Sequence, residues 1–320
     1  MSAATTAVPA AAEAARGTRR RAPLSDRRRQ EARLGLLLAS PAIVVLLAVV
    51  GYPILQAVWD SLFNYKLTNP DARSFVGLGN YGLILSDPIW WQALGVTVLI
   101  TVVTVVVELV LGFALALVMN NALGALRPGL RTAILIPYAI ITVVSAFAFR
   151  FMFDLTSGFV NAWLPFVGDD TDWFASFGTA VTVISISEIW KTTPFISLLL
   201  LSGLAQVPGE LQEAAKVDGA TWWQRMRRVT IPNMKAAIMV ALLFRTLDAF
   251  RIFDNIFIMT NGAAGTESVS FLAYRQTIQR LEIGIGSAVS VLLTIAVALI
   301  ALMFVKGFKV NLAASTRAGR

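Results

Sequence analysis

The chain has 320 residues, of which 57% are hydrophobic and only 14% are charged, and its formal net charge is +8. A soluble domain of ordinary composition is about 25% charged, so this chain has more apolar surface than one globular core can bury. Cysteine and histidine are both absent, which excludes disulfides, thiol nucleophiles, imidazole metal ligands and His-based catalytic triads. The composition indicates a membrane protein.

Six apolar stretches are long enough to cross a bilayer, which requires roughly 20 mostly apolar residues. They cover about 34–59, 91–119, 132–153, 174–204, 236–260 and 283–305. The first and last contain no charge, whereas the fifth is interrupted by Arg245, Asp248, Arg251 and Asp254. The sequence therefore predicts an all-α integral membrane protein with six transmembrane helices, of which the fifth is the least regular.

The basic residues predict the orientation of these helices. If both termini are cytoplasmic, nineteen of the 27 basic residues lie in inner segments, and the outer segments contain only Lys66, Arg73, Arg275 and Arg280. Cytoplasmic loops of membrane proteins carry this excess of Lys and Arg. The asymmetry also accounts for the positive net charge, so we expect a multi-pass protein of the plasma (cytoplasmic) membrane and no nucleic-acid partner.

The two ends of the chain differ in composition from the apolar region 34–308. Residues 1–33 are rich in Ala, Thr and Arg, which favours a disordered, basic cytoplasmic tail. A signal peptide is the alternative, but the basic region is too long and the following apolar run exceeds an ordinary signal-peptide core. Residues 309–320 are expected to form a second cytoplasmic tail.

The inner loop 205–235 is longer than the other inner loops and has the pattern of two helices. Pro208 suits a helix start, Glu210 favours its first turn, and Gly219 permits a sharp turn. A second helical stretch is expected over 220–229, and Pro232 separates it from the fifth span. The loop is therefore predicted to be a helix–turn–helix at the cytoplasmic surface.

Two interpretations of this loop remain open on composition alone. It could be an amphipathic segment at the membrane interface, with Trp222 and Trp223 among the lipid headgroups and its arginines on anionic lipid. It could instead be a docking element for a cytoplasmic partner, because a small Glu-Ala-Ala surface before a Gly turn lets another backbone approach closely.

The motif Glu213-Ala-Ala-x-x-Asp218-Gly219-Ala220, followed by Ile231-Pro232, resembles the EAA loop of permease subunits of ATP-binding-cassette importers. Four further segments resemble carbohydrate permeases of this group: Phe75–Tyr81, Arg131–Pro137, Trp190–Phe195 and Ala249–Asp254. The resemblance covers about 34–308 and is to the maltose-type sugar uptake permeases, in particular to first permease subunits of mycobacterial (actinobacterial) trehalose importers. One departure is Thr260-Asn-Gly-Ala-Ala264, where such permeases often read Thr-x-Gly-Gly-Pro.

This resemblance implies the type I importer permease fold and a subunit that forms half of a pathway for a disaccharide, with trehalose the first choice. The implied partners are a second homologous permease, two copies of a cytoplasmic ATPase and an extracytoplasmic sugar-binding (lipo)protein. The residues implied to couple to the ATPase are Glu213, Ala214, Ala215, Asp218, Gly219 and Ala220.

The absence of a phosphate-binding loop supports this division of labour independently. No Gly-Lys pair occurs in the chain, so it has no Gly-x-x-x-x-Gly-Lys-Ser/Thr motif. ATP hydrolysis is therefore expected to belong to a partner chain, and this chain is expected to be a non-enzyme without a cofactor.

Ionisable groups at membrane depth need compensation, because a charge at the centre of a spanning helix costs about 2.5–3.5 kcal/mol. The run Arg245–Asp248–Arg251–Asp254 alternates in sign every three residues, as do Glu188 and Lys191, so neighbours can pair on one helix face. Structural ion pairs are one interpretation. The other is a polar pathway for sugar hydroxyls, with the candidate residues Glu188, Trp190, Lys191, Phe253, Asp254 and Asn255.

Two functions from other classes are weighed against a sugar permease. A membrane-embedded, glycosyltransferase-like enzyme would need an acid–base pair at a substrate cleft, and no paired-carboxylate motif stands out at the membrane surface. A stand-alone secondary transporter often contains internal repeats with broken helices, and no convincing repeat is present. Neither alternative explains the EAA segment.

Overall fold

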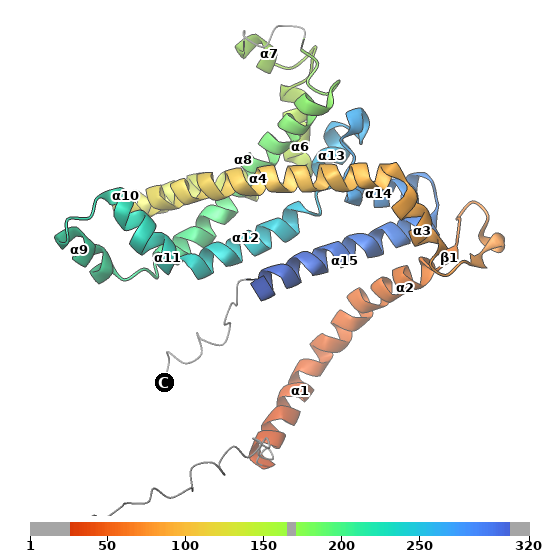
Figure 1. Cartoon of the computed structure of the whole chain (residues 1–320), viewed down its shortest axis with the longest axis horizontal. Coiled ribbons are helices and arrows are strands. Elements are labelled where there is room, and N and C mark those ends of the chain that lie inside the picture. The colour runs from red at the N-terminus through yellow and green to blue at the C-terminus, as the bar shows by residue number, and fades with distance from the viewer. Residues whose placement is uncertain (1–25, 165–170, 308–320) are drawn as a thin grey trace, which may run out of the picture. The chain divides into compact units, whose positions relative to one another are not determined.

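The computed structural model describes residues 26–164 and 171–307, and the chain divides into two compact units between Leu55 and Gln56 (Figure 1). The first unit contains α1 (Asp26–Leu46), the π-helical turn η1 (Leu47–Gly51) and the start of α2 (Tyr52–Asp60). Helix α1 thus begins inside the stretch 1–33 that was predicted to be a disordered tail. Residues 1–25 and the predicted tail 309–320 lie outside the described residues.

The second unit opens with a short antiparallel hairpin. Strand β1 (Phe63–Asn64) pairs with β2 (Ser74–Phe75), with the 3-10 turn η2 (Pro70–Ala72) between them. Helix α3 (Gly79–Ser86) follows. The next helix, α4 (Pro88–Asn121), begins where the Asp87 side chain accepts a hydrogen bond from the Ile89 backbone N–H and proline occupies the first helical position.

Helix α4 packs along α8 (Phe177–Leu204), and the two form the centre of the second unit (Figure 1). They approach closely at Gly112, where an added Cβ would lie 2.8 Å from Ile196 Cγ2. A small residue at this point lets the two backbones come together, as is usual between membrane helices. An apolar core formed with α12 (Lys235–Ala249) fills the space beside this contact.

The predicted third span, 132–153, is bent rather than straight. It consists of α5 (Arg127–Ala139) and α6 (Thr142–Met152), whose axes differ by 83°. Ile140 and Ile141 have extended backbone conformations between the two helices. Since Pro137 lacks a backbone N–H donor, it weakens the end of α5 just before the bend.

The fifth predicted span, 236–260, which was expected to be the least regular, is not one continuous helix. Helix α12 ends at Ala249, residues 250–253 leave the helical path, and α13 (Asp254–Met259) starts again beyond them. Broken helices at membrane depth are tolerated where the exposed backbone is buried in protein or lines a wet cavity. The break adjoins the polar pocket described below. A wet pocket at this position accounts for the polar residues of the fifth span and for its irregular backbone.

By length and composition, four helices in the described part of the chain can cross a membrane: Arg33–Asp60, Pro88–Asn121, Phe177–Leu204 and Ile283–Gly307. The number becomes five if the bent pair α5–α6 is one span. This confirms a helical, multi-span architecture, while the total of six spans and the cytoplasmic location of both termini stay predictions.

The remaining elements form the connections and the last span. Between α6 and α8 lies α7 (Val160–Trp163). After α13 come η4 (Ala263–Gly265), α14 (Val269–Tyr274), the π-helical turn η5 (Arg275–Gln279) and α15 (Ile283–Gly307). Gly284 at the start of α15 meets the hairpin so closely that a Cβ would lie 2.1 Å from the Phe63 carbonyl oxygen. A glycine is therefore required at this junction.

Candidate functional site

The loop 205–235 begins with a short, well-terminated helix, α9 (Gly209–Val217). Its last turn closes with two backbone hydrogen bonds, from the Ala220 N–H to the Ala215 carbonyl at 2.9 Å and from the Gly219 N–H to the Lys216 carbonyl at 3.0 Å. Gly219 lies between them with φ of 74°. This is a Schellman motif, in which glycine is favoured because it has no Cβ to clash in the left-handed conformation.

The second half of the loop is helical but less regular than predicted over 220–229. It contains α10 (Trp222–Arg225), the π-helical turn η3 (Met226–Thr230) and α11 (Ile231–Asn233). Thr221 and Gln224 form a reciprocal capping box at its start. The Gln212 side chain donates a hydrogen bond of 2.8 Å to Thr230 Oγ1, which ties α9 to η3. The helix–turn–helix is thus held by contacts within the loop.

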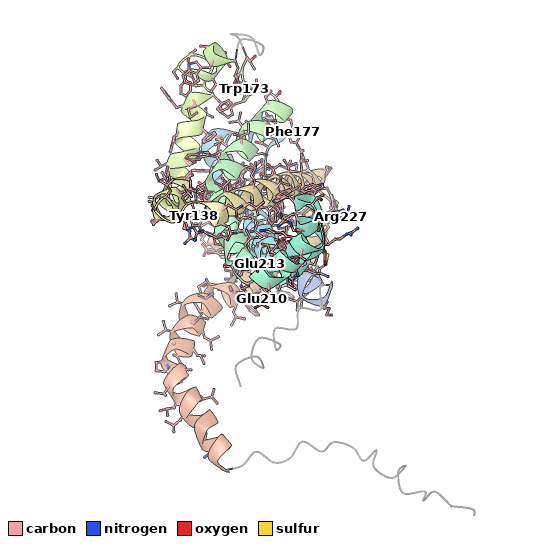
Figure 2. The ribbon with its side chains drawn as sticks, turned by 90° about the vertical axis from the view of Figure 1, so that its left-hand side faces the viewer. Tyr138, Trp173, Phe177, Glu210, Glu213 and Arg227 are labelled. Carbon is pink, nitrogen blue, oxygen red and sulfur yellow. The ribbon has the colours of Figure 1, made fainter. Side chains whose placement is uncertain are left out.

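The residues proposed for coupling lie together on the outer side of this loop. Glu213, Ala214, Asp218 and Gly219 are exposed, and Ala215 and Ala220 are half-buried. Figure 2 shows Glu210 and Glu213 on α9 and the Arg227 side chain projecting outward from η3. No atom lies within 4 Å of the position that a Gly219 Cβ would occupy. The surface is small and open, as close approach by another backbone requires.

The aromatic residues of the loop only partly follow the amphipathic interpretation. Trp222 and Trp223 stack with ring centroids 5.3 Å apart and are 53% and 70% exposed. Met226 is buried on the inner side of the loop. The stacked pair is therefore available either to lipid headgroups or to a partner.

A second candidate site is a polar pocket of about 250 Å³ beside the break between α12 and α13. It is built from five helices and the break itself. Its lining consists of Tyr138, Thr142, Glu188, Lys191, Thr192, Asp248, Arg251, Ile252, Phe253, Asp254 and Asn255. Five of the six residues predicted for a sugar pathway thus line one pocket. The exception is Trp190, whose ring lies 5.7 Å from the ring of Phe149.

Two carboxylates of the pocket lining, Glu188 and Asp248, belong to an ion cluster centred on the buried Arg245. Its guanidinium donates from Nε and Nη2 to both carboxylate oxygens of Glu108, at 2.5 and 3.0 Å. The same Nη2 is 2.8 Å from Glu188 Oε1, and Nη1 is 2.7 Å from Asp248 Oδ2. Arg245 is 1% exposed and Glu108 fully buried. Bidentate pairing of this kind compensates charges that would otherwise oppose membrane insertion.

The ion pairs differ from those expected from spacing along single helices. Glu188 pairs with Arg245 rather than with Lys191, whose ammonium lies 5.5 Å from the centre of the Tyr138 ring. Arg251 donates through Nε to the Leu247 carbonyl. Within the described residues, only Arg245 and Asp248 of the alternating run form an ion pair. Packing explains why the observed pairs differ from the expected ones. The buried guanidinium of Arg245 pairs with the carboxylates that α4 and α8 place beside it.

Glu108 belongs to the cluster, although nothing in the sequence connected it with the candidate pathway residues. Its carboxylate also accepts a hydrogen bond of 2.7 Å from Thr192 Oγ1, so α4 and α8 are joined through it. The only available signal was a single acidic residue in an otherwise apolar span. Such a residue requires a partner, but its identity depends on helix packing.

Glu267, which lies outside the predicted spans, has a perturbed pKa. Burial raises the pKa of Glu267 above its ordinary value, and the positive charges of Arg275 and Arg280 only partly offset this effect. The Arg275 guanidinium lies 2.9 Å from one carboxylate oxygen of Glu267. The other oxygen is buried without a hydrogen-bond partner among the described residues. Glu267 therefore holds its proton more tightly in the folded protein than in the unfolded chain.

Comparison with known proteins decides the family. Residues 108–313 match the model of the binding-protein-dependent transport system inner membrane component. The chain belongs to this family. It is therefore a multi-pass inner-membrane permease, a non-catalytic transport subunit of a system that depends on a binding protein.

Its relatives include sugar permeases of similar length. The chain is 49% identical to the trehalose transport system permease protein SugA of Mycobacterium tuberculosis, over 88% of this chain and 90% of that protein. It is 38% identical to the trehalose/maltose transport system permease protein MalF of Thermococcus litoralis, over 87% and 94%.

The fold also matches a solved permease. In the crystal structure of a bacterial ABC transporter that imports the acidic polysaccharide alginate, one chain matches with a TM-score of 0.75 and 21% identity. The match covers 89% of this chain and all of that one. The importer permease fold expected from the EAA loop is thereby confirmed.

Proposed function

We propose that this chain is the permease subunit of an ATP-driven sugar importer and forms half of the pathway for a disaccharide, with trehalose the leading candidate. The observation that carries this proposal is the 49% identity, over nearly the whole chain, to a permease named for trehalose transport. The lining of the pocket agrees with it, because hydroxyl-rich ligands need several hydrogen-bonding groups at fixed positions.

The loop 205–235 is proposed to couple transport to a separate cytoplasmic ATPase. Three features support this role: an open surface around Glu213, a rigid turn at Gly219, and bonds that hold the loop as one unit. A rigid loop of this kind can transmit the closure of the ATPase dimer to the transmembrane helices that follow the loop. The exposed rings of the stacked tryptophans can in addition contact lipid headgroups.

The proposed importer contains four further subunits or partners. A second homologous permease would complete the pathway, two copies of the ATPase would power it, and an extracytoplasmic sugar-binding (lipo)protein would deliver the sugar. The family description supports the dependence on a binding protein. Co-purification of this chain should therefore recover a second membrane subunit and an ATPase, whereas recovery of this chain alone in a transport-competent form would contradict the proposal.

The substrate is tested by uptake of labelled disaccharides in a strain that lacks the importer and is complemented by this chain with its partner subunits. Trehalose should enter, and Asn255→Ala and Glu188→Gln should reduce its uptake or alter its selectivity. Trp190→Phe is the matched control, because Trp190 lies on α8 but outside the pocket lining. If Asn255→Ala and Glu188→Gln transport like the parent, the pathway assignment is refuted.

Coupling is tested at Gly219 and Glu213. Proline cannot adopt a positive φ, so Gly219→Pro should break the turn and separate ATP hydrolysis from uptake while the protein stays inserted. Asparagine tolerates the left-handed conformation, which makes Gly219→Asn the matched control with uptake retained. Glu213→Lys should uncouple in the same way as Gly219→Pro. Normal transport by Gly219→Pro and Glu213→Lys would refute the docking role.

A further inference from the structure

A chain of hydrogen bonds runs from Glu108 and Arg245 through Glu188 to Asn255 of the pocket lining. Glu188 accepts from Arg245 through Oε1 and from the Asn255 side-chain amide through Oε2, at 2.8 and 2.5 Å. Asn255 is 1% exposed and belongs to the pocket lining, whereas Arg245 and Glu108 do not. The two ends of this chain lie on α4 and α13, which are distant in the sequence.

The chemistry of the carboxylate decides how the Asn255 amide is oriented. An ionised carboxylate only accepts hydrogen bonds, so Asn255 must turn its NH₂ group toward Glu188. Its carbonyl oxygen Oδ1 then remains, and this atom is buried without a hydrogen-bond partner among the described residues. A buried acceptor without a partner is costly, and a ligand that donates a hydrogen bond to it removes that cost.

Arg245 donates to Oε1 of Glu188, which leaves Oε2 for Asn255, and Glu108 keeps Arg245 in place. Both carboxylate oxygens of Glu108 are engaged by Arg245, and Oε1 also accepts from Thr192. Arg245 therefore has a fixed orientation in which Nη2 reaches Glu188. Without the charge of Glu108, the guanidinium is free to draw both oxygens of Glu188 toward itself and away from Asn255.

We infer that Glu108 and Arg245 are positioning residues for substrate selectivity: through Glu188 they hold Asn255 so that it presents only an acceptor to the pocket. The ligand must then supply a hydroxyl donor at that point. This inference rests on the proposed function, because it takes the pocket to be part of a sugar pathway. It goes further by assigning a role to two residues that do not touch the sugar.

The experiment uses the complete importer in a deletion strain, with trehalose and a panel of trehalose analogues in which one hydroxyl at a time is replaced by fluorine. Fluorine keeps the approximate size of the hydroxyl but cannot donate a hydrogen bond. In the parent, at least one analogue should have a KM about ten-fold higher than trehalose, because Oδ1 stays unpaired. Asn255→Ala identifies that position, since this penalty should disappear when the acceptor is removed.

Glu108→Gln and Arg245→Lys should then reduce the same penalty to about three-fold or less and leave the penalties at other positions unchanged. Lysine keeps the charge of Arg245 but cannot engage two carboxylates in a fixed fork. Thr101→Val is the matched control: Thr101 is a buried polar residue of α4 outside the cluster, and its replacement should keep the full penalty. A ratio of two KM values does not depend on the amount of folded protein.

The outcomes separate this inference from the proposed function. If Glu108→Gln lowers uptake of trehalose and of every analogue in the same proportion, the cluster is purely structural and the inference is overturned. The same holds if the parent does not discriminate between any analogue and trehalose. If the parent importer carries no disaccharide at all, the proposed function itself fails, and the inference fails with it.

Discussion

Removal of the Arg245 side chain gives the sharpest test of the buried cluster. Arg245→Met keeps much of the side-chain volume but leaves the carboxylates of Glu108 and Glu188 buried without their counter-charge. Breaking a buried ion pair by deleting one partner costs about 3–5 kcal/mol. Since folded proteins are stable by only about 5–15 kcal/mol, this variant should lose a large part of its stability.

The assay is thermal unfolding of the detergent-solubilised importer, followed by the amount of monodisperse complex that survives heating. At roughly 2–4 °C per kcal/mol for a domain of this size, the midpoint of Arg245→Met should fall by about 10 °C. Arg251→Met is the matched control, because Arg251 is exposed in the break after α12 and donates through Nε only to the Leu247 carbonyl. Its cost should stay below about 1 kcal/mol.

A compensated variant tests the electrostatic reason for the loss. Glu108→Gln and Glu188→Gln, introduced together into Arg245→Met, replace the unpaired carboxylates by neutral amides of similar shape. More than half of the lost stability should return, because the main cost is the uncompensated buried charge. If Arg245→Met unfolds no earlier than Arg251→Met, the cluster does not stabilise the fold and this reasoning is refuted.

Three further predictions concern other parts of the second unit. Gly112→Ala should cost about 1–3 kcal/mol in the same unfolding assay because the new Cβ would press on α8; Gly95→Ala, in open space on the same helix, should cost nothing. Ala264→Gly should stabilise by about 1 kcal/mol, since Ala264 has φ of 53° in the loop after α13, and an unchanged midpoint would contradict this. The pKa of Glu267 is raised above 4.5 in the folded protein, so its contribution to stability is present below pH 4.5 and is lost as the pH rises through the raised value. Glu267→Gln should flatten that part of the profile of unfolding midpoint against pH.

The EAA loop illustrates a feature that the sequence determines almost completely. Its helix start at Pro208, its turn at Gly219 and the exposure of Glu213 follow from residues close to one another in the chain. Helix caps and left-handed turns depend on local backbone geometry. They can therefore be predicted before any packing is known, as the four long apolar helices could be from their hydropathy alone.

The charged residues of the fifth span show the opposite case. Spacing along one helix predicted partners three residues apart, and Arg245 does meet Asp248 in that way. Its buried partners, however, are Glu108 on α4 and Glu188 on α8. Which carboxylates lie beside a guanidinium depends on how distant helices pack, and no local pattern contains that information.

The sequence alone determined that this chain is a helical membrane protein with a helical inner loop and no Gly-x-x-x-x-Gly-Lys-Ser/Thr motif, because hydropathy, turn chemistry and motif spacing act over short stretches of chain. Only the tertiary structure decided where the spans bend or break and which charges meet. These outcomes follow from burial: α12 ends where its polar residues meet α4, α8 and the pocket, and each charge takes the partner that packing brings within reach.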